Sequence, residues 1–208
     1  MTGRELFRLI KPLLNAASCG LRVLPQAFVA SSWWIVSYLP GKPGVAIRYL
    51  IAKRLCRQCG DNVMIGTGVT VDFWDRLSIG NNVTIHQFCY LDANGGISIG
   101  DNVSIAHATS LVAFEHSWSD VNTPIKYNPL IPGKIEIGSD VWIGCGVRVL
   151  SGTTIGERTI VAAGAVVTRG RYARGIYGGV PARHLKSLDT SANAAVQPDQ
   201  NVISVPAA

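Results

Sequence analysis

Histidine is the side chain in this sequence best suited to acid–base chemistry, because the unperturbed pKa of imidazole lies close to neutral pH. His116 differs in position from His86, His107 and His184. It stands where a regular repeat stops and residues 116–134 begin, HSWSDVNTPIKYNPLIPGK, which do not follow that repeat. A loop of this length within a compact domain is uncommon and usually functional. We therefore take His116 as the candidate catalytic residue and interpret the other three histidines as structural.

Five cysteines could act as nucleophiles or metal ligands, but their spacing favours neither role. The pair in Cys56-x-x-Cys59 has no second pair nearby, as a zinc site made of thiolates would require. The number of cysteines is odd, and no small-residue cleavage site follows a clean apolar run near the N-terminus. These features predict reduced thiols in a cytoplasmic protein with no metal.

The repeat that stops at His116 and resumes after residue 134 has a period of six residues. Large aliphatic residues recur in its clearest run at Ile137, Ile143, Val149, Ile155, Val161 and Val167. Small or β-branched residues stand four positions after the first five of these, at Val141, Val147, Thr153, Thr159 and Ala165. A period of six fits neither an α-helix nor an isolated strand. It fits a coil of three flat faces whose turns stack at about 4.8 Å, so we predict a parallel β-helix with both residue sets pointing inward.

Glycines mark the corners and the turns of this predicted coil. Glycine often follows the large aliphatic residue, at Gly66, Gly80, Gly100, Gly138, Gly144 and Gly156. We expect a corner there with a backbone conformation that other residues adopt only at a cost. The glycines at 60, 80, 100, 138 and 156 are separated by 20, 20, 38 and 18 residues. Eighteen residues make three regular hexads, whereas 20 predicts a two-residue bulge and 38 predicts about twenty inserted residues.

Residues 1–58 differ in charge from the rest of the chain. They contain nine Lys and Arg residues and one acidic residue, which gives them a net charge of +8. Because the whole chain has a net charge of +6, the remaining residues carry −2. The mildly acidic remainder argues against nucleic acid as a partner of the main domain.

Within this basic segment, ELFRLIKPLLNAASCGLRVLP and KPGVAIRYLIAKRLCRQ have the pattern of short amphipathic helices. The apolar stretch between them, AFVASSWWIVSYLP, is bounded by prolines and is too short to span a membrane convincingly. Cations beside Trp33, Trp34 and Tyr38 favour contact with a membrane surface. The alternative is that these residues cap the end of the coil or pack between subunits.

The hexads, the loop, IGSDVWIGCGVRVLSGTTIGERTIVAAGAVVT and the later GGVPARHLK together resemble the hexapeptide-repeat acyltransferases. The closest branch contains maltose, galactoside and bacterial polysaccharide O-acetyltransferases. The resemblance covers roughly residues 60–186 and implies a left-handed coil, a homotrimer and acetyl-CoA bound in the groove between adjacent coils. The usual preference for right-handed crossovers would have suggested the opposite hand. We thus expect a mainly β protein, a left-handed parallel β-helix with an N-terminal helical extension and one long loop.

The expected organisation has four parts: residues 1–58, basic and partly helical; 59–170, the β-helix with its loop 116–134; 171–187, a segment of the CoA site; and 188–208, a disordered tail.

In the resembling family, a histidine at the position of His116 is the general base. A neutral imidazole can deprotonate a sugar hydroxyl as it attacks a thioester and can then protonate the departing thiolate. Glu115, which we group with the acceptor-binding candidates, could orient the imidazole only if the corner bends, because neighbours on a strand point to opposite sides; otherwise it is a surface charge. Tyr90 and Asp92 lie one turn earlier, where the family holds the acetyl acceptor, or they are surface residues of a corner.

The resemblance also assigns residues to acetyl-CoA: Trp142, Cys145, Ala163, Gly164, Thr168, Arg183 and Lys186. Trp142 and Cys145 would line the pantetheine groove, and the small residues would let the backbone approach the ligand. Arg183 and Lys186 suit the phosphates, because fixed cations bind them well. The alternative for Arg183 is an ordinary surface charge.

These observations predict an acetyl-CoA-dependent O-acetyltransferase that acts on a sugar hydroxyl in polysaccharide or glycan assembly. The basic, Trp-rich N-terminus favours a lipid-linked glycan over a free saccharide and places the protein at the inner face of the membrane. An N-acetyltransferase of an amino sugar or antibiotic keeps the same chemistry. A zinc enzyme resembling γ-class carbonic anhydrases needs three converging histidines, and His86, His107 and His116 occupy different hexad positions. The last alternative is a non-catalytic trimeric scaffold.

Overall fold

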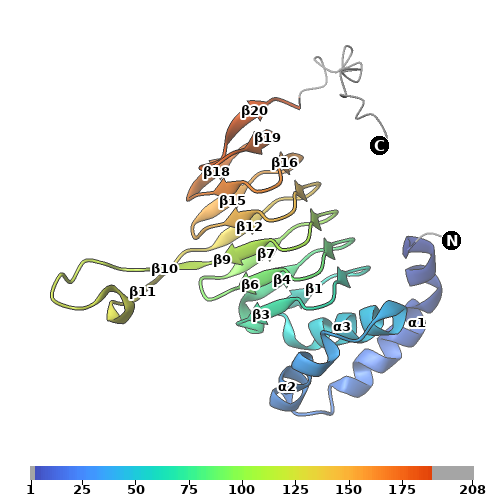
Figure 1. The fold of residues 1–208 in the computed structure, drawn as a ribbon. Helices are drawn as coiled ribbons and strands as arrows, with labels where there is room; N and C mark the ends of the chain where they lie inside the picture. The colour runs from blue at the N-terminus through green and yellow to red at the C-terminus, as the bar shows by residue number, and fades with distance from the viewer. Residues whose placement is uncertain (1–2, 189–208) are drawn as a thin grey trace, which may run out of the picture.

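A computed structural model describes residues 3–188, so the tail predicted to be disordered lies, apart from its first residue, outside the described part of the chain. Three helices come first: α1 (Gly3–Leu21), α2 (Gln26–Val36) and α3 (Gly41–Leu55). The sequence predicted helices at α1 and α3, and the apolar stretch between them is also helical. Figure 1 shows the three helices together at one end of a coil of strands, with β20 at the other end.

The coil has about six turns and three faces and matches a left-handed β-helix, which confirms the predicted fold. The first face contains β1 (Gln58–Cys59), β4 (Leu77–Ile79), β7 (Ile97–Ile99), β12 (Ile135–Ile137), β15 (Thr153–Ile155) and β18 (Gly170–Tyr172). The second contains β2 (Met64–Ile65), β5 (Thr84–Ile85), β8 (Ser104–Ile105), β13 (Trp142–Ile143), β16 (Thr159–Val161), β19 (Gly175–Gly178) and β20 (Arg183–Lys186). The third contains β3 (Thr70–Asp72), β6 (Tyr90–Asp92), β9 (Ser110–Val112), β14 (Arg148–Val149) and β17 (Val166–Val167).

The core of the coil consists of the two residue sets that the hexad period predicted to point inward. From Ile137 to Val167, every member of both sets is buried, with at most 3% of its surface exposed. The parallel register stacks like on like, so Ile99 pairs with Ile137 and Ile137 pairs with Ile155. Each such buried aliphatic side chain contributes roughly 1.5–3 kcal/mol of hydrophobic stabilisation. The inward orientation of the hexads is therefore confirmed.

The corner glycines are required for a reason different from the one predicted. Gly66, Gly80, Gly100, Gly138, Gly144 and Gly156 are absent from the residues with a positive φ. They are constrained by space, since a Cβ on Gly138 would lie 2.7 Å from the backbone nitrogen of Glu157 on the next turn. The left-handed conformation occurs two residues later, at Asn62, Asn82, Asn102, Asp140 and Arg158, with φ between 52° and 57°. Asn and Asp tolerate that conformation better than most residues.

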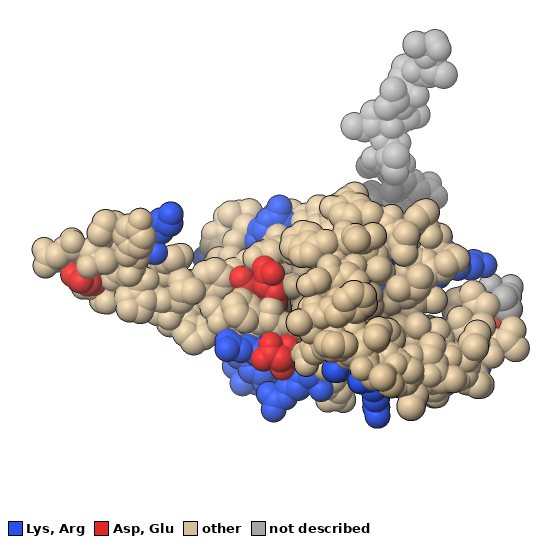
Figure 2. All heavy atoms as spheres, turned by 90° about the horizontal axis from the view of Figure 1, so that it is seen from below, with Lys and Arg blue, Asp and Glu red and all other residues tan. Residues whose placement is uncertain are grey.

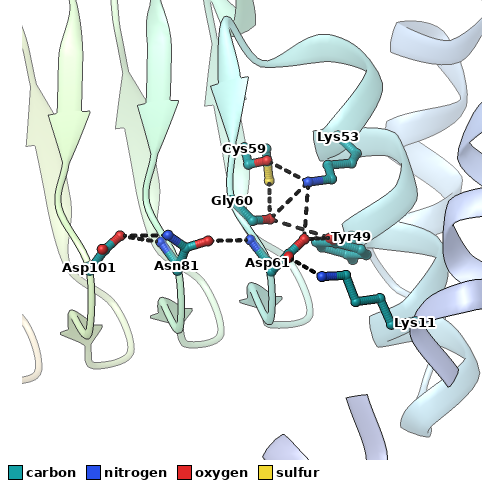
Figure 3. Close-up of polar contacts among 8 residues, drawn as sticks. All are labelled: Lys11, Tyr49, Lys53, Cys59, Gly60, Asp61, Asn81 and Asp101. Carbon is teal, nitrogen blue, oxygen red and sulfur yellow. Dashed lines mark hydrogen bonds and ion pairs between the residues drawn. The ribbon is translucent and has the colours of Figure 1, made fainter. Parts of the chain in front are cut away.

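Polar side chains connect the helices to the first turns of the coil (Figure 3). Lys11 on α1 forms an ion pair with Asp61, with 2.6 Å between Nζ and Oδ2. Lys53 on α3 donates to the carbonyl of Cys59 at 2.8 Å. The backbone nitrogen of Asp61 donates to Asn81 Oδ1, and that of Asn81 donates to Asp101 Oδ1. The hydrogen bond from Lys11 lowers the pKa of Asp61, so this carboxylate stays charged and holds α1 on the coil.

Two segments do not follow the six-residue repeat and lie beside each other, namely the corner after β6 and the insertion between β9 and β12. In the turns of 20 residues, the extra residues follow β3 and β6; a short 3₁₀ helix, Trp74–Arg76, occupies the first of these corners. The long insertion leaves the coil between β9 and β12 as a hairpin of β10 (Phe114–His116) and β11 (Leu130–Pro132). A second 3₁₀ helix, Ile125–Tyr127, lies near its tip. Figure 1 shows this arm projecting sideways from the coil.

Replacing Gly138 with alanine should destabilise the coil, because the new Cβ would meet backbone atoms that cannot rotate away. We expect a loss of about 1–3 kcal/mol in the free energy of unfolding, measured by urea denaturation. Gly20→Ala on α1 is the matched control, because a Cβ on Gly20 would have no neighbouring atom within 4 Å. Equal stability of the two variants would contradict the requirement for close approach.

Candidate active site

His116 is the last residue of β10 and lies opposite Leu130 of β11 at the root of the arm. Its ring packs edge-on against Phe114, two residues earlier on the same side of the strand, with 6.1 Å between ring centroids. Its Nδ1 atom is buried and has no hydrogen-bond partner among the described residues. The ring thus contacts Phe114 and is not anchored by a hydrogen bond at Nδ1 within the described chain.

Glu115 lies on the other side of β10, as the alternation of a strand requires. Its Oε1 accepts a hydrogen bond from Arg169 Nη2, which belongs to a later turn of the coil. The same nitrogen lies 3.5 Å from Ser151 Oγ. The structure thus places the carboxylate where it ties the arm to the coil, and its suggested roles in orienting His116 or holding an acceptor stay predictions.

A cluster of three polar side chains lies at the ends of β3 and β6. Tyr90 Oη donates to Asp72 Oδ2 at 2.9 Å and lies 3.3 Å from Asp92 Oδ2. Burial and the hydrogen bond to Asp72 raise the pKa of Tyr90 far above its ordinary value, so the phenol remains a donor. Asp92 is 6% exposed and also accepts from the backbone of Asn94 at 3.0 Å. The structure brings Tyr90 and Asp92 together, and it adds Asp72, which the sequence did not single out.

The widened corner after β6 packs against the root of the arm. The backbone nitrogen of Ala113, just before β10, donates to the carbonyl of Asp92 at 3.0 Å. A Cβ on Gly95 would lie 2.1 Å from the carbonyl oxygen of Ala113 and 2.5 Å from the nitrogen of Gly133. The two extra corner residues and the hairpin therefore form one assembly, with His116 three residues beyond Ala113.

The arm is organised by Asn128, which is 4% exposed. Its Nδ2 donates to the carbonyls of Thr123 at 2.9 Å and Asp120 at 3.2 Å, and its Oδ1 accepts from the nitrogen of Asp120 at 3.2 Å. One amide thus satisfies several backbone groups of the loop. Sequence reasoning missed Asn128, although an asparagine in a Pro-rich loop, TPIKYNPLIP, is a recognisable turn signal.

Two of the residues assigned to acetyl-CoA lie at stacked corners of neighbouring turns. The nitrogen of Gly164 donates to the carbonyl of Cys145 at 2.8 Å, and Ala163 and Gly164 are exposed. A Cβ on Gly164 would meet nothing within 4 Å. Trp142, on β13 just before this corner, is 55% exposed. The corners present uncovered backbone beside an exposed aromatic ring, which suits a long, thin ligand.

The remaining candidates lie at the end of the coil. Thr168 Oγ1 is 3.3 Å from Tyr172 Oη, and the tyrosine also donates to the carbonyl of Thr168, so this side chain is engaged within the fold. Arg183 and Lys186 are exposed on β20, which folds back antiparallel to β19. Within residues 3–188, the only hydrogen bond from the Arg183 side chain goes to the neighbouring carbonyl of Ala182, at 3.2 Å.

Within residues 3–188, no group of three or more His, Cys, Asp or Glu side chains is placed to hold a metal ion. The described residues thus offer no ligand set for the zinc alternative.

The sequence model described as Bacterial transferase hexapeptide (six repeats) matches residues 134–169. A Mycobacterium tuberculosis protein with an inferred acetyltransferase assignment is 36% identical over 119 residues, 57% of this chain; the chain spans 38% of that protein's length. A Staphylococcus aureus protein with the same kind of assignment is 31% identical over 152 residues, covering 73% of this chain and 75% of its own. An Escherichia coli protein, assigned by inference as a lipopolysaccharide biosynthesis O-acetyltransferase, is 29% identical, covering 62% and 71%.

Solved structures give the same picture. A hexapeptide-repeat acetyltransferase of Vibrio cholerae in complex with acetyl coenzyme A superposes with a TM-score of 0.69 at 28% identity, covering 79% of this chain and 87% of that one. A galactoside acetyltransferase in complex with coenzyme A has a TM-score of 0.74 at 23% identity, covering 84% and 86%, and at that identity it supports the fold alone.

Removing the amide of Asn128 should loosen the arm and leave the coil intact. In Asn128→Ala, the backbone groups of Asp120 and Thr123 lose their buried partner, so we expect hydrogen exchange across residues 117–130 to rise on the order of tenfold. Asn122→Ala, an exposed asparagine in the same loop, should leave exchange unchanged. If both variants exchange alike, Asn128 does not organise the arm.

Proposed function

Because this chain belongs to the hexapeptide-repeat acetyltransferases, we propose that it transfers an acetyl group from acetyl-CoA to a sugar hydroxyl with His116 as the general base. The observation that carries the catalytic assignment is the position of His116. It ends β10 at the root of the only hairpin insertion within the described coil, with one ring nitrogen enclosed.

His116 would accept the proton of the acceptor hydroxyl as the oxygen attacks the thioester carbonyl. The C–S bond of the resulting tetrahedral intermediate then breaks, and the imidazolium returns the proton to the leaving thiolate. No net proton is gained or lost, so one histidine can serve both half-steps. Nε2 would be the basic nitrogen, because Nδ1 is enclosed, and the contact with Phe114 would help to orient the ring.

The acceptor is proposed to be a saccharide or a lipid-linked glycan. Tyr90 and Asp72 offer a phenol and a carboxylate at the corner beside the arm, which are suitable partners for sugar hydroxyls. Asp92 is nearly buried and already engaged by Asn94, so its role would be to position Tyr90. The E. coli relative assigned to lipopolysaccharide biosynthesis supports a part in glycan assembly.

Acetyl-CoA would lie along the stacked corners of Cys145 and Gly164, beside Trp142, with Arg183 and Lys186 near its phosphates. The exposed small residues at these corners and the open space beside Gly164 support this placement of the donor. A homotrimer, with the groove between adjacent coils, would complete the site. The free thiols of all five cysteines are consistent with a cytoplasmic location.

His116→Ala should reduce acetyl transfer at least ~10²-fold, because the hydroxyl loses its general base. The binding of acetyl-CoA, measured by calorimetry, should be retained. Transfer is followed by thiol release over a panel of free sugars, lipid-linked glycans and aminated antibiotics; mild base cleaves an ester product and spares an amide. Asn122→Ala in the same loop is the control and should keep full activity. Retained transfer in His116→Ala would overturn the catalytic assignment.

Arg183→Ala should raise the KM for acetyl-CoA roughly tenfold with little change in kcat, because a charge-assisted contact to a phosphate is lost. The difference should shrink as the salt concentration rises. Arg158→Ala is the control, since Arg158 is an exposed arginine paired with Asp140 at a different corner. An unchanged KM in Arg183→Ala would remove this residue from the site.

A further inference from the structure

The helical cap, defined as α1, α2 and α3 with the segments that join them, covers the end of the coil with its inner face. Trp33 donates to the carbonyl of Val69 at 2.9 Å. Arg48 is 1% exposed and donates to the carbonyls of Ile65 and Leu39, each at 2.7 Å. The carbonyl of Ser37 accepts from the nitrogen of Gly68 at 2.9 Å. Covering the first turn therefore accounts for the inner face of the cap and leaves the outer face unexplained.

The outer face of the cap exposes large apolar side chains. Phe28, Trp34 and Ile35 on α2, and Tyr38 just after it, are between 62% and 76% exposed. An apolar hollow of about 250 Å³ adjoins Phe28 and lies between the end of α1, α2 and α3. This outer apolar face is larger than a single exposed residue and marks an interaction surface.

The same cap carries an excess of positive charge that it does not neutralise internally. Lys11 and Lys53 are paired with Asp61, and Arg48 is bonded to carbonyls. Besides these and the acidic residue Glu5, the helices and the residues next to their ends carry six cations, Arg4, Arg8, Arg22, Lys42, Arg54 and Arg57. Figure 2, seen from the helical end, shows a largely uncharged surface over the helices with Lys and Arg toward its margins.

Two of these cations converge on a second hollow. Ser18, Arg22, Lys53 and Arg54 line about 370 Å³ between α1 and α3. The Nε atom of Arg54 is buried and has no hydrogen-bond partner in the described chain. Arg22, Lys53 and Arg54 bring positive charge to this hollow, so it would attract an anion such as a lipid phosphate.

We propose that the helical cap binds the surface of an anionic lipid bilayer, with the outer apolar face in the interface and the hollow at Arg22 and Arg54 on a lipid phosphate. Aromatic side chains beside Lys and Arg are typical of surfaces that lie in the headgroup region. No helix among residues 3–188 is long and apolar enough to cross a membrane, so the contact is peripheral.

The charge of the cap favours this occupant over the cap of a second copy of the chain. Two caps facing each other would bring two sets of cations together, whereas an anionic surface attracts them. In the proposed trimer, parallel coils would turn three caps toward the same plane, and three weak contacts would reinforce one another. The inference does not depend on the acceptor, because vesicle binding is measured without any transfer.

The test is sedimentation of the full chain with vesicles of phosphatidylcholine alone or with phosphatidylglycerol added. Binding should require the anionic lipid and weaken in high salt. Trp34→Ser combined with Ile35→Ser should reduce binding on the order of tenfold, and Arg22→Ala roughly fivefold. Each variant should melt at the temperature of the parent protein and keep its acetyl-CoA binding.

Trp118→Ser and Lys126→Ala are the matched controls, because Trp118 is 70% exposed on the arm, close to the 67% of Trp34, and Lys126 is exposed there too. Both should bind vesicles as the parent protein does. Three results would overturn the proposal: binding no stronger with the anionic lipid, equal losses in cap and arm variants, or a change of oligomeric state in Trp34→Ser/Ile35→Ser, which would identify a second copy as the occupant.

Discussion

The constraint on which this structure depends is the close stacking of one turn of backbone on the next. Parallel ladders fix the spacing of successive turns at roughly 4.8 Å, so every position on one turn has a fixed neighbour above and below. Ile137 lies between Ile99 and Ile155, although 38 residues separate one pair and 18 the other. At the corners the approach is closer still, and at Gly60, Gly100 and Gly138 even a methyl group would collide with the adjacent turn. A residue that does not fit this spacing has to leave the coil.

This constraint explains where the candidate active site lies. The regular turns bury their hexads and present short strands that differ little from one another. Residues that exceed the regular count are displaced outward, after β6 and between β9 and β12, and the two displaced segments meet at Gly95 and Gly133. The coil holds the roots of both segments rigidly, because the Ala113 and Asp92 backbones are bonded to each other. A histidine at such a root can have a fixed direction, while the loop beyond it remains free to vary with the substrate.

What the sequence could predict follows from the same geometry. In a coil, residues at a fixed spacing along the chain occupy equivalent positions on successive turns. The period of six could therefore predict the inward residues, the length of each turn and the inserted loop. The reason for the corner glycines was misjudged, because the left-handed residue falls at Asn82 or Asn102, two positions later, and close approach is invisible in one dimension. Partnerships that depend on side-chain direction were also missed: Tyr90 with Asp72, Glu115 with Arg169, and the amide of Asn128 with its loop. The sequence spacing of these pairs follows no period, so it could not predict them.

A stacked coil also has open ends, and the way this chain closes one of them shapes the rest of the cap. Unpaired strand edges invite further stacking, so a terminal turn needs a cover that satisfies its carbonyls. Arg48 donates a hydrogen bond to the carbonyl of Ile65. Its buried guanidinium is tolerated there because further carbonyls also accept hydrogen bonds from it. Covering the edge uses one face of α2 and α3. The opposite face is then under no structural demand from the coil, and a soluble monomer would be expected to make it polar. It instead carries Phe28, Trp34 and Ile35, the pattern of a surface that contacts something outside the subunit.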